Sequence, residues 1–383
     1  MITGNQNTDY ARGLEGVVAA ETRIGFVDGI NGRLVYRGYN IEELAEYSTF
    51  EELSYLLLYG KLPTKAEFEK FTARLNADNK IDDHLFKVLQ ECTKASHPMS
   101  ALRTGVSYLG SMDKDSNKYD LPSQEAMGLR LMGKFPSLVA AINRALQGKP
   151  MVRSNDPNYT VRFLEESFGK KPTEFETKVF RTALILHADH GMNASTFASM
   201  VTISTLSDMY SAITSAISSL KGPLHGGANE QALANLERIG SPKNADKVIS
   251  EMLEKKEKIM GFGHRVYKVY DPRAKILKEY AKKLAGETGH NELFETAEEV
   301  ERVMINKLGT KGIFPNVDFY SGIVYKSLGF DPRLFTPIFA LSRISGWFAR
   351  SFEYLHDNRL FRPRSMYKGE VGPLTYIPMQ NRK

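Results

Sequence analysis

A histidine set among glycines and a proline occurs in the string Gly222-Pro-Leu-His-Gly-Gly-Ala-Asn-Glu230. The glycines allow this backbone to approach a ligand closely. A helix that begins just after His225 favours the neutral imidazole, because the positive end of its dipole disfavours a second positive charge. A neutral imidazole can donate a hydrogen bond to an oxygen that gains negative charge during a reaction. The alternative interpretation is an incidental loop histidine.

A second histidine, His264, lies in the cation-rich string Gly261-Phe-Gly-His-Arg-Val-Tyr-Lys-Val-Tyr-Asp-Pro-Arg273. These cations suit carboxylates and phosphates, and arginine can bind a carboxylate through two parallel hydrogen bonds. Gly261 and Gly263 alone do not make a phosphate motif, because neither a Gly-x-Gly-x-x-Gly nor a Walker pattern follows. Taken by itself, the string is also compatible with an ordinary solvated loop.

An aspartate, Asp318, stands between apolar residues in the string Pro315-Asn-Val-Asp-Phe-Tyr-Ser-Gly322. The simplest interpretation is that its carboxylate caps a helix that runs to Leu328. Its apolar neighbours can also desolvate the carboxylate, which would raise its pKa and suit it to act as a general base.

The string Leu186-His-Ala-Asp-His-Gly-Met-Asn193 places Asp189 between two histidines, His187 and His190, that are three residues apart. Three interpretations stay open: a zinc or iron site, histidines that cap a helix end, and a group that binds or positions an anion. The metal interpretation is the least favoured, because the spacing lacks the fuller metal motifs.

Arginines crowd the C-terminal part of the chain, and they are Arg343, Arg350, Arg359, Arg362 and Arg364. Seven residues separate Arg343 from Arg350, so the two share one helix face. A solvated or ion-paired face is the ordinary interpretation. Arg343, however, lies among Leu341, Ile344 and Trp347, where an unpaired charge would be costly. We therefore expect a bound anion or a partner carboxylate there.

Most of the chain predicts helices, so we expect an all-α fold that positions these side chains. The exception is a β-hairpin over residues 23–39, indicated by Asp28-Gly29 and Asn31-Gly32. Capping boxes predict helix starts at Ser48 with Glu51, Thr64 with Glu67 and Thr173 with Glu176. Thr336-Pro337 predicts the start of a helix that runs to about His356.

Length and breaker residues predict two domains, because 383 residues exceed what one hydrophobic core usually serves. Breakers cluster near Gly222 and Gly329. We expect a large helical domain from residues 1–222 and 330–383, and a small domain from residues 223–329. Residues 173–220 are rich in small side chains, which predicts either the packed centre of the large domain or a helix-built dimer interface.

Composition narrows the class of protein further. Hydrophobic residues make up 42% and charged residues 25%, which excludes disorder and collagen-like repeats. The single cysteine, Cys92, excludes a disulfide framework within the chain and a cysteine-built zinc site. No run of 18 apolar residues occurs, and residues 1–12 lack the apolar part of a secretory signal. We therefore expect a cytoplasmic protein without a membrane span.

The formal charge of +6 is spread along the chain, which is typical of a solvated surface. Local positive potential would also attract anionic small molecules. A basic stripe with interleaved aromatic residues is missing, so we expect no nucleic acid partner.

Taken together, these strings resemble the citrate synthase family, in the short form found in many bacteria and archaea. Gly261 to Arg273 matches the family signature throughout, and Gly222 to Gly227, Asn316 to Gly322 and Arg362-Pro-Arg-Ser-Met366 match its other blocks in order. The likeness runs from Gly13-Leu-Glu-Gly16 to Arg362. The 2-methylcitrate synthases share all these strings, so the resemblance indicates the reaction type better than the substrate.

The resemblance implies an almost entirely helical homodimer with two domains that close on the substrate. It implies condensation of acetyl-CoA, a co-substrate, with oxaloacetate and hydrolysis of the thioester, without a metal or a tightly bound cofactor. Asp318 would remove the methyl proton, His225 would hydrogen-bond the thioester oxygen, and His264 would polarise the ketone.

The other residues implied by the resemblance bind the substrates. The oxaloacetate residues would be His190, Arg273, Arg343 and, from the other subunit, Arg362. The CoA residues would be Gly261, Phe262, Gly263, Arg265 and Lys268. Lys268 stands where some relatives carry arginine. The competing hypotheses are a 2-methylcitrate synthase, a non-catalytic anion-binding helical scaffold, and a metal-dependent hydrolase that uses His187, Asp189 and His190.

Overall fold

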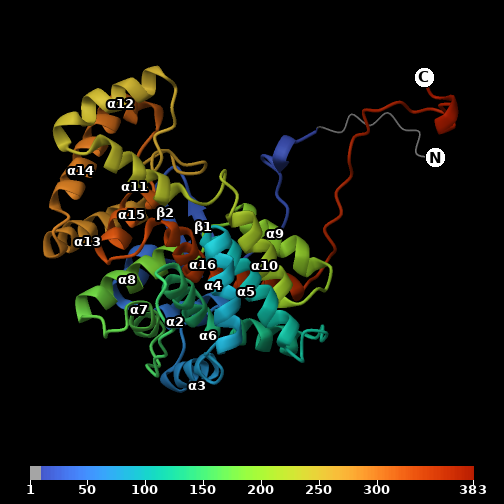
Figure 1. The fold of residues 1–383 in the computed structure, drawn as a ribbon, viewed down its shortest axis with the longest axis horizontal. Coiled ribbons are helices and arrows are strands. Elements are labelled where there is room, and N and C mark those ends of the chain that lie inside the picture. The colour runs from blue at the N-terminus through green and yellow to red at the C-terminus, as the bar shows by residue number, and fades with distance from the viewer. Residues whose placement is uncertain (1–9) are drawn as a thin grey trace.

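The structure, a computed structural model, describes residues 10–383, so the expectation about the polar residues 1–12 falls largely outside it. Most of the described chain is helical (Figure 1), which confirms the all-α fold class. The helices are α1 (Ile41–Tyr47), α2 (Phe50–Tyr59), α3 (Lys65–Asn76), α4 (Asp83–Ala95), α5 (Pro98–Met112), α6 (Leu121–Leu146), α7 (Tyr159–Phe168), α8 (Glu174–His187), α9 (Ala194–Ser204), α10 (Met209–Leu220), α11 (Ala228–Ile239), α12 (Ala245–Glu254), α13 (Pro272–Thr288), α14 (Asn291–Leu308), α15 (Val317–Ser327) and α16 (Phe335–Leu355). Short 3-10 helices lie at Arg12–Leu14, Pro242–Asn244, Gly309–Lys311, Pro332–Leu334 and Met379–Asn381.

The predicted hairpin is present as a small antiparallel sheet of β1 (Gly25–Asp28), β2 (Arg33–Tyr36) and β3 (Tyr39–Asn40). In its turn, Asp28 accepts hydrogen bonds from the backbone N–H groups of Ile30 and Asn31. The same turn touches a distant loop, because Lys268 donates its backbone N–H to the carbonyl of Gly29 at 3.0 Å. A Cβ on Gly29 would lie 2.1 Å from the carbonyl oxygen of Val266, so only glycine fits this contact.

Two of the three predicted capping boxes are confirmed, at Thr64 with Glu67 and at Thr173 with Glu176. The third prediction is wrong by one residue. Thr49, rather than Ser48, caps α2 and accepts from the backbone N–H of Glu52 at 3.1 Å. Two neighbouring hydroxyls, Ser48 and Thr49, are each followed three positions later by a glutamate, so the sequence allows the helix to begin in either of two registers. In the register that the structure adopts, Glu51 is free to make a tertiary contact. The buried Glu51 carboxylate accepts the backbone N–H of Tyr159 at 2.7 Å.

The predicted start of the last long helix is also wrong. α16 begins at Phe335, directly after the 3-10 turn Pro332–Leu334, so Thr336 and Pro337 lie inside its first turn. A proline is tolerated there because first-turn N–H groups have no partner within the helix. The end of α16 at Leu355 agrees with the predicted end near His356.

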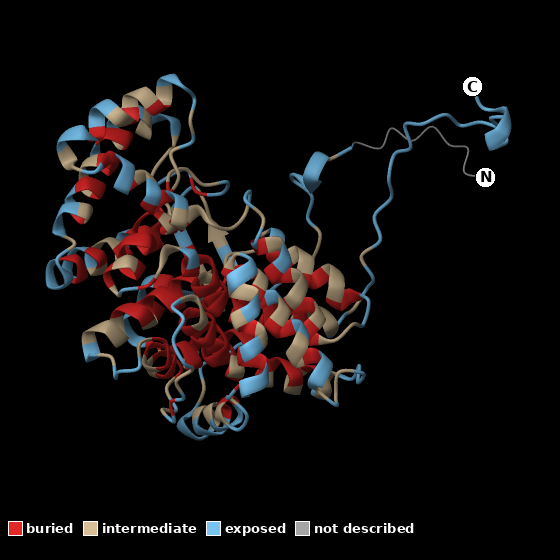
Figure 2. Cartoon of the chain, viewed as in Figure 1, coloured by how far each residue is buried: buried red, intermediate tan, exposed pale blue. Residues whose placement is uncertain are grey.

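α16 lies at the centre of the core and contacts α2, α5, α6, α8, α9 and α10. Figure 2 shows this centre as the most buried part of the molecule. Helices α11 to α15 contact one another and gather in a separate part of the chain, at the upper left of Figure 1. They fall within residues 223–329, although the exact domain boundaries stay a prediction.

The residues after α16 leave the helical body as an extended tail (Figure 1). Its apolar side chains are exposed, including Leu374 and Tyr376, each with 77% of its surface accessible. None of the helices within residues 10–383 is both long enough and apolar enough to cross a membrane.

Candidate active site

His225 lies in the loop between α10 and α11, and its ring reaches the first turn of α9. Its Nε2 accepts the backbone N–H of Ser195 at 3.2 Å and lies 2.8 Å from the Ser195 hydroxyl. Because a backbone N–H can only donate, Nε2 carries the lone pair and the ring proton sits on Nδ1. Burial, with the positive charge of Arg343, lowers the pKa of His225 to about 4, so the ring is neutral near pH 7.

His264 is held in the opposite tautomer. Its Nδ1 accepts the backbone N–H groups of Val266 at 2.9 Å and Tyr267 at 3.0 Å, so its proton sits on Nε2. Burial, with the charge of Arg273, lowers the pKa of His264 to about 4. The His190 ring lies beside it, with ring centres 4.9 Å apart. His264 can therefore donate one hydrogen bond from Nε2 without carrying a charge.

Asp318 lies in the first turn of α15, but the interpretation of Asp318 as a helix cap is wrong. The cap is Asn316, whose Oδ1 accepts the backbone N–H of Asp318 at 3.0 Å. The Asp318 carboxylate lines a small pocket together with His225, Asn229 and Phe339. Burial raises its pKa to about 6, although the charges of Arg273 and Arg343 oppose the rise. A carboxylate in such a setting is a better proton acceptor than an exposed one.

Three buried arginines, Arg273, Arg343 and Arg350, differ in whether the guanidinium forms an ion pair with a carboxylate of the chain. Arg273 binds Asp271 through Nε at 3.0 Å and Nη2 at 2.8 Å. Arg350 binds Asp189 in the same two-point manner, at 3.0 and 2.7 Å. Asp271 was not among the sequence candidates, although it stands two residues before Arg273 in the quoted string.

Arg343 has no carboxylate within 4.0 Å among residues 10–383, although it is only 2% exposed. Its Nε donates to the carbonyl of His187 at 2.6 Å, and its guanidinium lies 4.4 Å from the centre of the Phe339 ring. Burial lowers its pKa to about 10, which still leaves it charged near neutral pH. Arg343 is thus a buried, charged arginine that no carboxylate of the described residues occupies, so it can receive an anion from outside the chain.

The cluster His187, Asp189 and His190 does not converge on one point. His187 is buried and its Nδ1 donates to the carbonyl of Ala183 at 2.7 Å, while Arg350 occupies Asp189. His190 instead turns toward Tyr267, whose hydroxyl lies 3.3 Å from its Nε2. Within the described part of the chain, no group of three His, Cys, Asp or Glu side chains could hold a metal ion. The metal interpretation therefore has no geometric support.

The loop predicted to meet CoA runs beside the start of α15. Phe262 pairs with Pro315 in an isolated β-bridge, and its ring centre lies 4.6 Å from that of Phe319. Gly261 has a φ of 86°, and a Cβ there would lie 2.8 Å from the Phe319 ring. Arg265 and Lys268 extend from the same loop into solvent.

One sequence candidate lies apart from the others. Arg362 is exposed in the C-terminal tail, which extends away from the helical body (Figure 1). By contrast, the rings of His190 and His264 lie side by side, and His225 and Asp318 line one pocket. The helical body of a single chain therefore carries every other candidate, whereas Arg362 lies in the tail.

Comparison with known proteins decides the family. The model of the family described as "Citrate synthase, C-terminal domain" matches residues 13–364. The chain belongs to the citrate synthase family. It is 48% identical to a citrate synthase of Deinococcus radiodurans over 94% of this chain and 96% of that one. The family resemblance predicted from the sequence is thus confirmed, and so is the class of enzyme, an acyltransferase.

Solved citrate synthases share the fold. One from Pyrobaculum aerophilum has a TM-score of 0.91 and 41% identity, covering 97% of this chain and 95% of that one. Another, from Thermoplasma acidophilum in a ternary complex with carboxymethyl coenzyme A and oxaloacetate, has a TM-score of 0.92 and 38% identity, covering 98% of this chain and all of that one. A 2-methylcitrate synthase of Shewanella oneidensis is also similar, at 40% identity over 97% of each chain.

Proposed function

We propose that this chain condenses acetyl-CoA with oxaloacetate and hydrolyses the resulting citryl-CoA to citrate and CoA. One observation carries the proposal beyond family membership. Two neutral imidazoles, each with its donor nitrogen set by backbone N–H groups, accompany a carboxylate whose pKa is raised to about 6. A reaction that moves a proton from carbon and builds up charge on two oxygens needs this set of groups.

The first step is removal of a proton from the acetyl methyl group. A methyl beside a thioester is a poor acid, so a carboxylate can act on it only if the enolate oxygen is stabilised at once. Asp318 takes the proton, and the Nδ1–H of His225 donates to the thioester oxygen across the pocket that both residues line. Each positioned acid or base of this kind contributes roughly 10²–10⁴-fold to the rate.

The second step forms the carbon–carbon bond. The Nε2–H of His264 donates to the ketone oxygen of oxaloacetate, so that the enol carbon attacks a polarised carbonyl. Water then attacks the thioester of citryl-CoA, and the CoA thiol leaves. The two histidines and the aspartate supply every proton transfer, so the chemistry requires no metal and no resident cofactor.

Charged groups around these residues suit a dicarboxylate. Arg343 is buried without a carboxylate partner among the described residues, and His190 lies against His264. The pair of Arg273 with Asp271 uses Nε and Nη2 and leaves out Nη1, and we propose that Nη1 binds a substrate carboxylate. The polyphosphate of CoA would meet Arg265 and Lys268, next to Gly261, Phe262 and Gly263.

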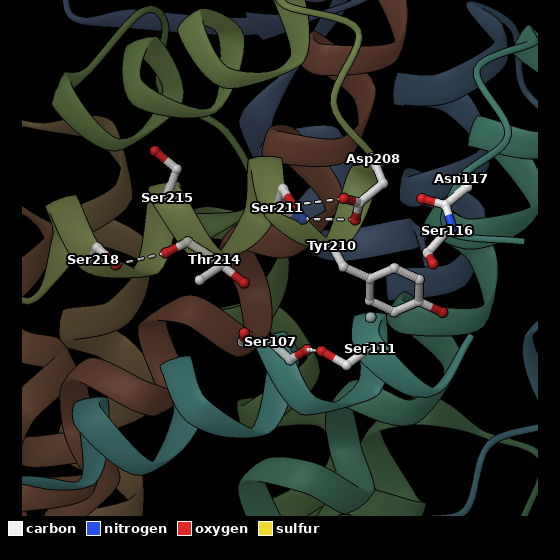
Figure 3. Close-up of a pocket in the computed structure, with 11 residues that line it drawn as sticks. Ser107, Ser111, Ser116, Asn117, Asp208, Tyr210, Ser211, Thr214, Ser215 and Ser218 are labelled. Atoms are coloured by element: carbon white, nitrogen blue, oxygen red, sulfur yellow. Dashed lines mark hydrogen bonds between the residues drawn. The ribbon is translucent and has the colours of Figure 1, made fainter. Parts of the chain in front are cut away.

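A homodimer is part of the proposal. Figure 3 shows a pocket between α5 and α10 lined by small hydroxyl side chains, among them Ser107, Ser111, Thr214 and Ser218. Small side chains let helices of a second copy approach closely. The exposed apolar tail would also be covered by that copy, and it would carry Arg362 to the copy's oxaloacetate site. In a closed two-fold dimer both sites would be completed in this way.

Mixed dimers test the shared site. Arg362→Ala and His264→Ala homodimers should each be nearly inactive. A heterodimer of the two has one site with both lesions and one with neither, so about half the activity per dimer should return. Verified heterodimers without any recovery would place Arg362 outside the partner's site.

The acyl substrate is the point at which the alternative, a 2-methylcitrate synthase, differs. Propionyl-CoA carries one more methylene than acetyl-CoA, which is worth only about 1–3 kcal/mol of discrimination. We therefore propose to compare kcat/KM for the two acyl-CoAs with oxaloacetate. A higher value with acetyl-CoA supports the proposal, a higher value with propionyl-CoA favours the alternative, and inactivity with both supports a non-catalytic scaffold. The cytoplasmic location expected from the sequence stays a prediction.

A further inference from the structure

We propose that Asn316 is a positioning residue that holds the Asp318 carboxylate and the His264 imidazole in a fixed relation. Its single amide bonds to both segments that carry these groups. The inference rests on the proposed function, because it concerns the base and the ketone-polarising acid assigned there.

Four hydrogen bonds join Asn316 to the two segments. Its Oδ1 accepts the backbone N–H of Asp318 at 3.0 Å, and its Nδ2 donates to the carbonyl of Gly263 at 2.9 Å. Its backbone N–H donates to the carbonyl of Gly261 at 2.9 Å, and its own carbonyl accepts from Phe319 at 3.1 Å. Gly263 directly precedes His264, so Nδ2 is bonded to the residue next to the acid, and Oδ1 is bonded to the backbone of the base itself.

The backbone partners fix the orientation of this amide. A backbone N–H can only donate and a carbonyl can only accept, so Oδ1 must face Asp318 and Nδ2 must face Gly263. Asparagine is the shortest side chain that presents a donor and an acceptor on separate atoms. Serine keeps the helix cap but has one hydroxyl near the backbone, and alanine keeps neither bond.

The loop on the His264 side needs such a bond. Gly261 and Gly263 have φ values of 86° and 79°, in a region that glycine enters without steric cost and also leaves easily. The β-bridge of Phe262 with Pro315 and the bond from Gly263 N–H to the carbonyl of Phe314 hold the earlier part of the loop. The Nδ2 bond of Asn316 is the contact that extends this pairing to the carbonyl joined to His264.

A shift of the imidazole by about 1 Å can cost roughly 10²-fold in rate, because the donor must meet the ketone oxygen as charge develops. Asn316→Ser removes the Gly263 bond and retains a good cap for α15. We expect it to slow condensation about tenfold or more, with little effect on steps that need only Asp318 and His225. Asn316→Ala removes both bonds and should slow both kinds of step.

The experiment compares these two variants with a matched control, Asn158→Ser. Asn158 caps α7 by accepting from Val161 at 2.9 Å, so the control makes the same change at a helix start away from the candidate site. Three quantities are measured: kcat for condensation, the carbonyl stretch of bound oxaloacetate, and exchange of acetyl-CoA methyl protons into D2O beside an unreactive dicarboxylate. Asn316→Ser should lower kcat and move the carbonyl stretch toward its value in free oxaloacetate, while proton exchange changes less than about twofold.

Two outcomes overturn the inference. In one, Asn316→Ser matches Asn158→Ser in kcat and carbonyl stretch. In the other, condensation and proton exchange fall equally, in step with a loss of thermal stability, which would mark a purely structural role. Failure of the proposed function is distinct, because the unsubstituted chain would then be inactive with both acyl-CoAs.

Discussion

The two loops that carry His225 and His264 each hold a neutral imidazole with one N–H available, but they use different hydrogen-bond partners. His264 is held by its own segment, since its Nδ1 accepts from residues two and three positions later. His225 is held by α9, since its Nε2 accepts from Ser195, thirty residues earlier. Both rings are neutral and both present one N–H, but from opposite nitrogens.

The tautomer of each histidine therefore has a separate structural origin. The tautomer of His264 is fixed by a turn within its own loop. The tautomer of His225 is fixed by a tertiary contact, which forms only when α9 packs against the loop between α10 and α11. Substitutions at the two histidines and at their neighbours therefore test whether the two tautomers arise separately.

Replacement of Asp318, the proposed base, should have the largest effect, because in the proposed mechanism both histidines act on charge that its proton transfer creates. Asp318→Asn should reduce kcat by roughly 10²–10⁴-fold. Thermal stability should hold or rise, because the substitution removes a carboxylate whose burial raises its pKa. Steady-state kinetics and thermal unfolding check this, and a variant that keeps more than about a tenth of kcat would contradict the assigned role.

Amide replacements should distinguish the two tautomers. The asparagine amide nitrogen approximates the position of imidazole Nδ1, and the glutamine amide nitrogen approximates Nε2. We therefore expect His225→Asn to retain about tenfold more activity than His225→Gln, and the order to be reversed at His264. Measured kcat values for the four variants check this, and the same order at both positions would refute the opposite tautomers.

The pH profile should reflect Asp318 rather than the histidines. Asp318 must be ionised to act as a base, so kcat/KM should fall about tenfold per unit as the pH drops below about 6. His225 and His264, with pKa values near 4, stay neutral over this range. If the acidic limb moves in a His264→Gln enzyme that retains activity, a histidine rather than Asp318 determines it.

The raised pKa of Asp318 and the lowered pKa values of His225 and His264 change the free energy of unfolding in opposite directions as the pH changes. The folded-state pKa of Asp318 is raised, so its favourable contribution is present at low pH and is lost as the pH rises through about 6. The folded-state pKa values of both histidines are lowered from 6.5, so their contribution is present above that pH and is lost as the pH falls toward 4. Asp318→Asn should accordingly gain more stability at pH 8 than at pH 4, relative to the unsubstituted chain, as denaturant unfolding would show.

The smallest effect is expected from Ser195→Ala. The substitution removes the hydroxyl beside His225 and the acceptor for the Trp347 indole, which donates to it at 3.1 Å. The backbone N–H of Ser195 still donates to Nε2, so the tautomer should persist and kcat should fall only a few-fold, in line with one lost hydrogen bond of about 1 kcal/mol. Nitrogen NMR of the His225 ring checks this, and a change of tautomer would show that the hydroxyl, not the backbone, sets it.

Several elements could be predicted from local sequence signals, because turns and helix caps depend only on residues a few positions apart. The turn residues of the hairpin and the Thr64 and Thr173 capping boxes are examples. The signals were misleading where two registers were equally good, as at Ser48 and Thr49, or where a preceding 3-10 turn moved the helix start, as at Phe335.

For the candidate site, residue type and order were sufficient to single out His225, His264 and Asp318, because glycine-rich loops and an apolar-flanked aspartate are visible in the chain itself. The partners of these residues were not visible. Asp271 beside Arg273, Ser195 beside His225 and Asn316 at the start of α15 were found only in the structure.

The sequence alone was enough to predict the family, the helical class and the candidate catalytic side chains, since these depend on residue types and on patterns a few positions long. The tertiary structure was needed to show that Arg343 is buried without a carboxylate within 4.0 Å among residues 10–383, which nitrogen of each histidine carries the proton, and why the Asp318 pKa is raised. These properties depend on burial and on donors from segments up to about 160 residues apart, as with Arg350 and Asp189. No local pattern encodes them, because desolvation and hydrogen bonding act through space rather than along the chain.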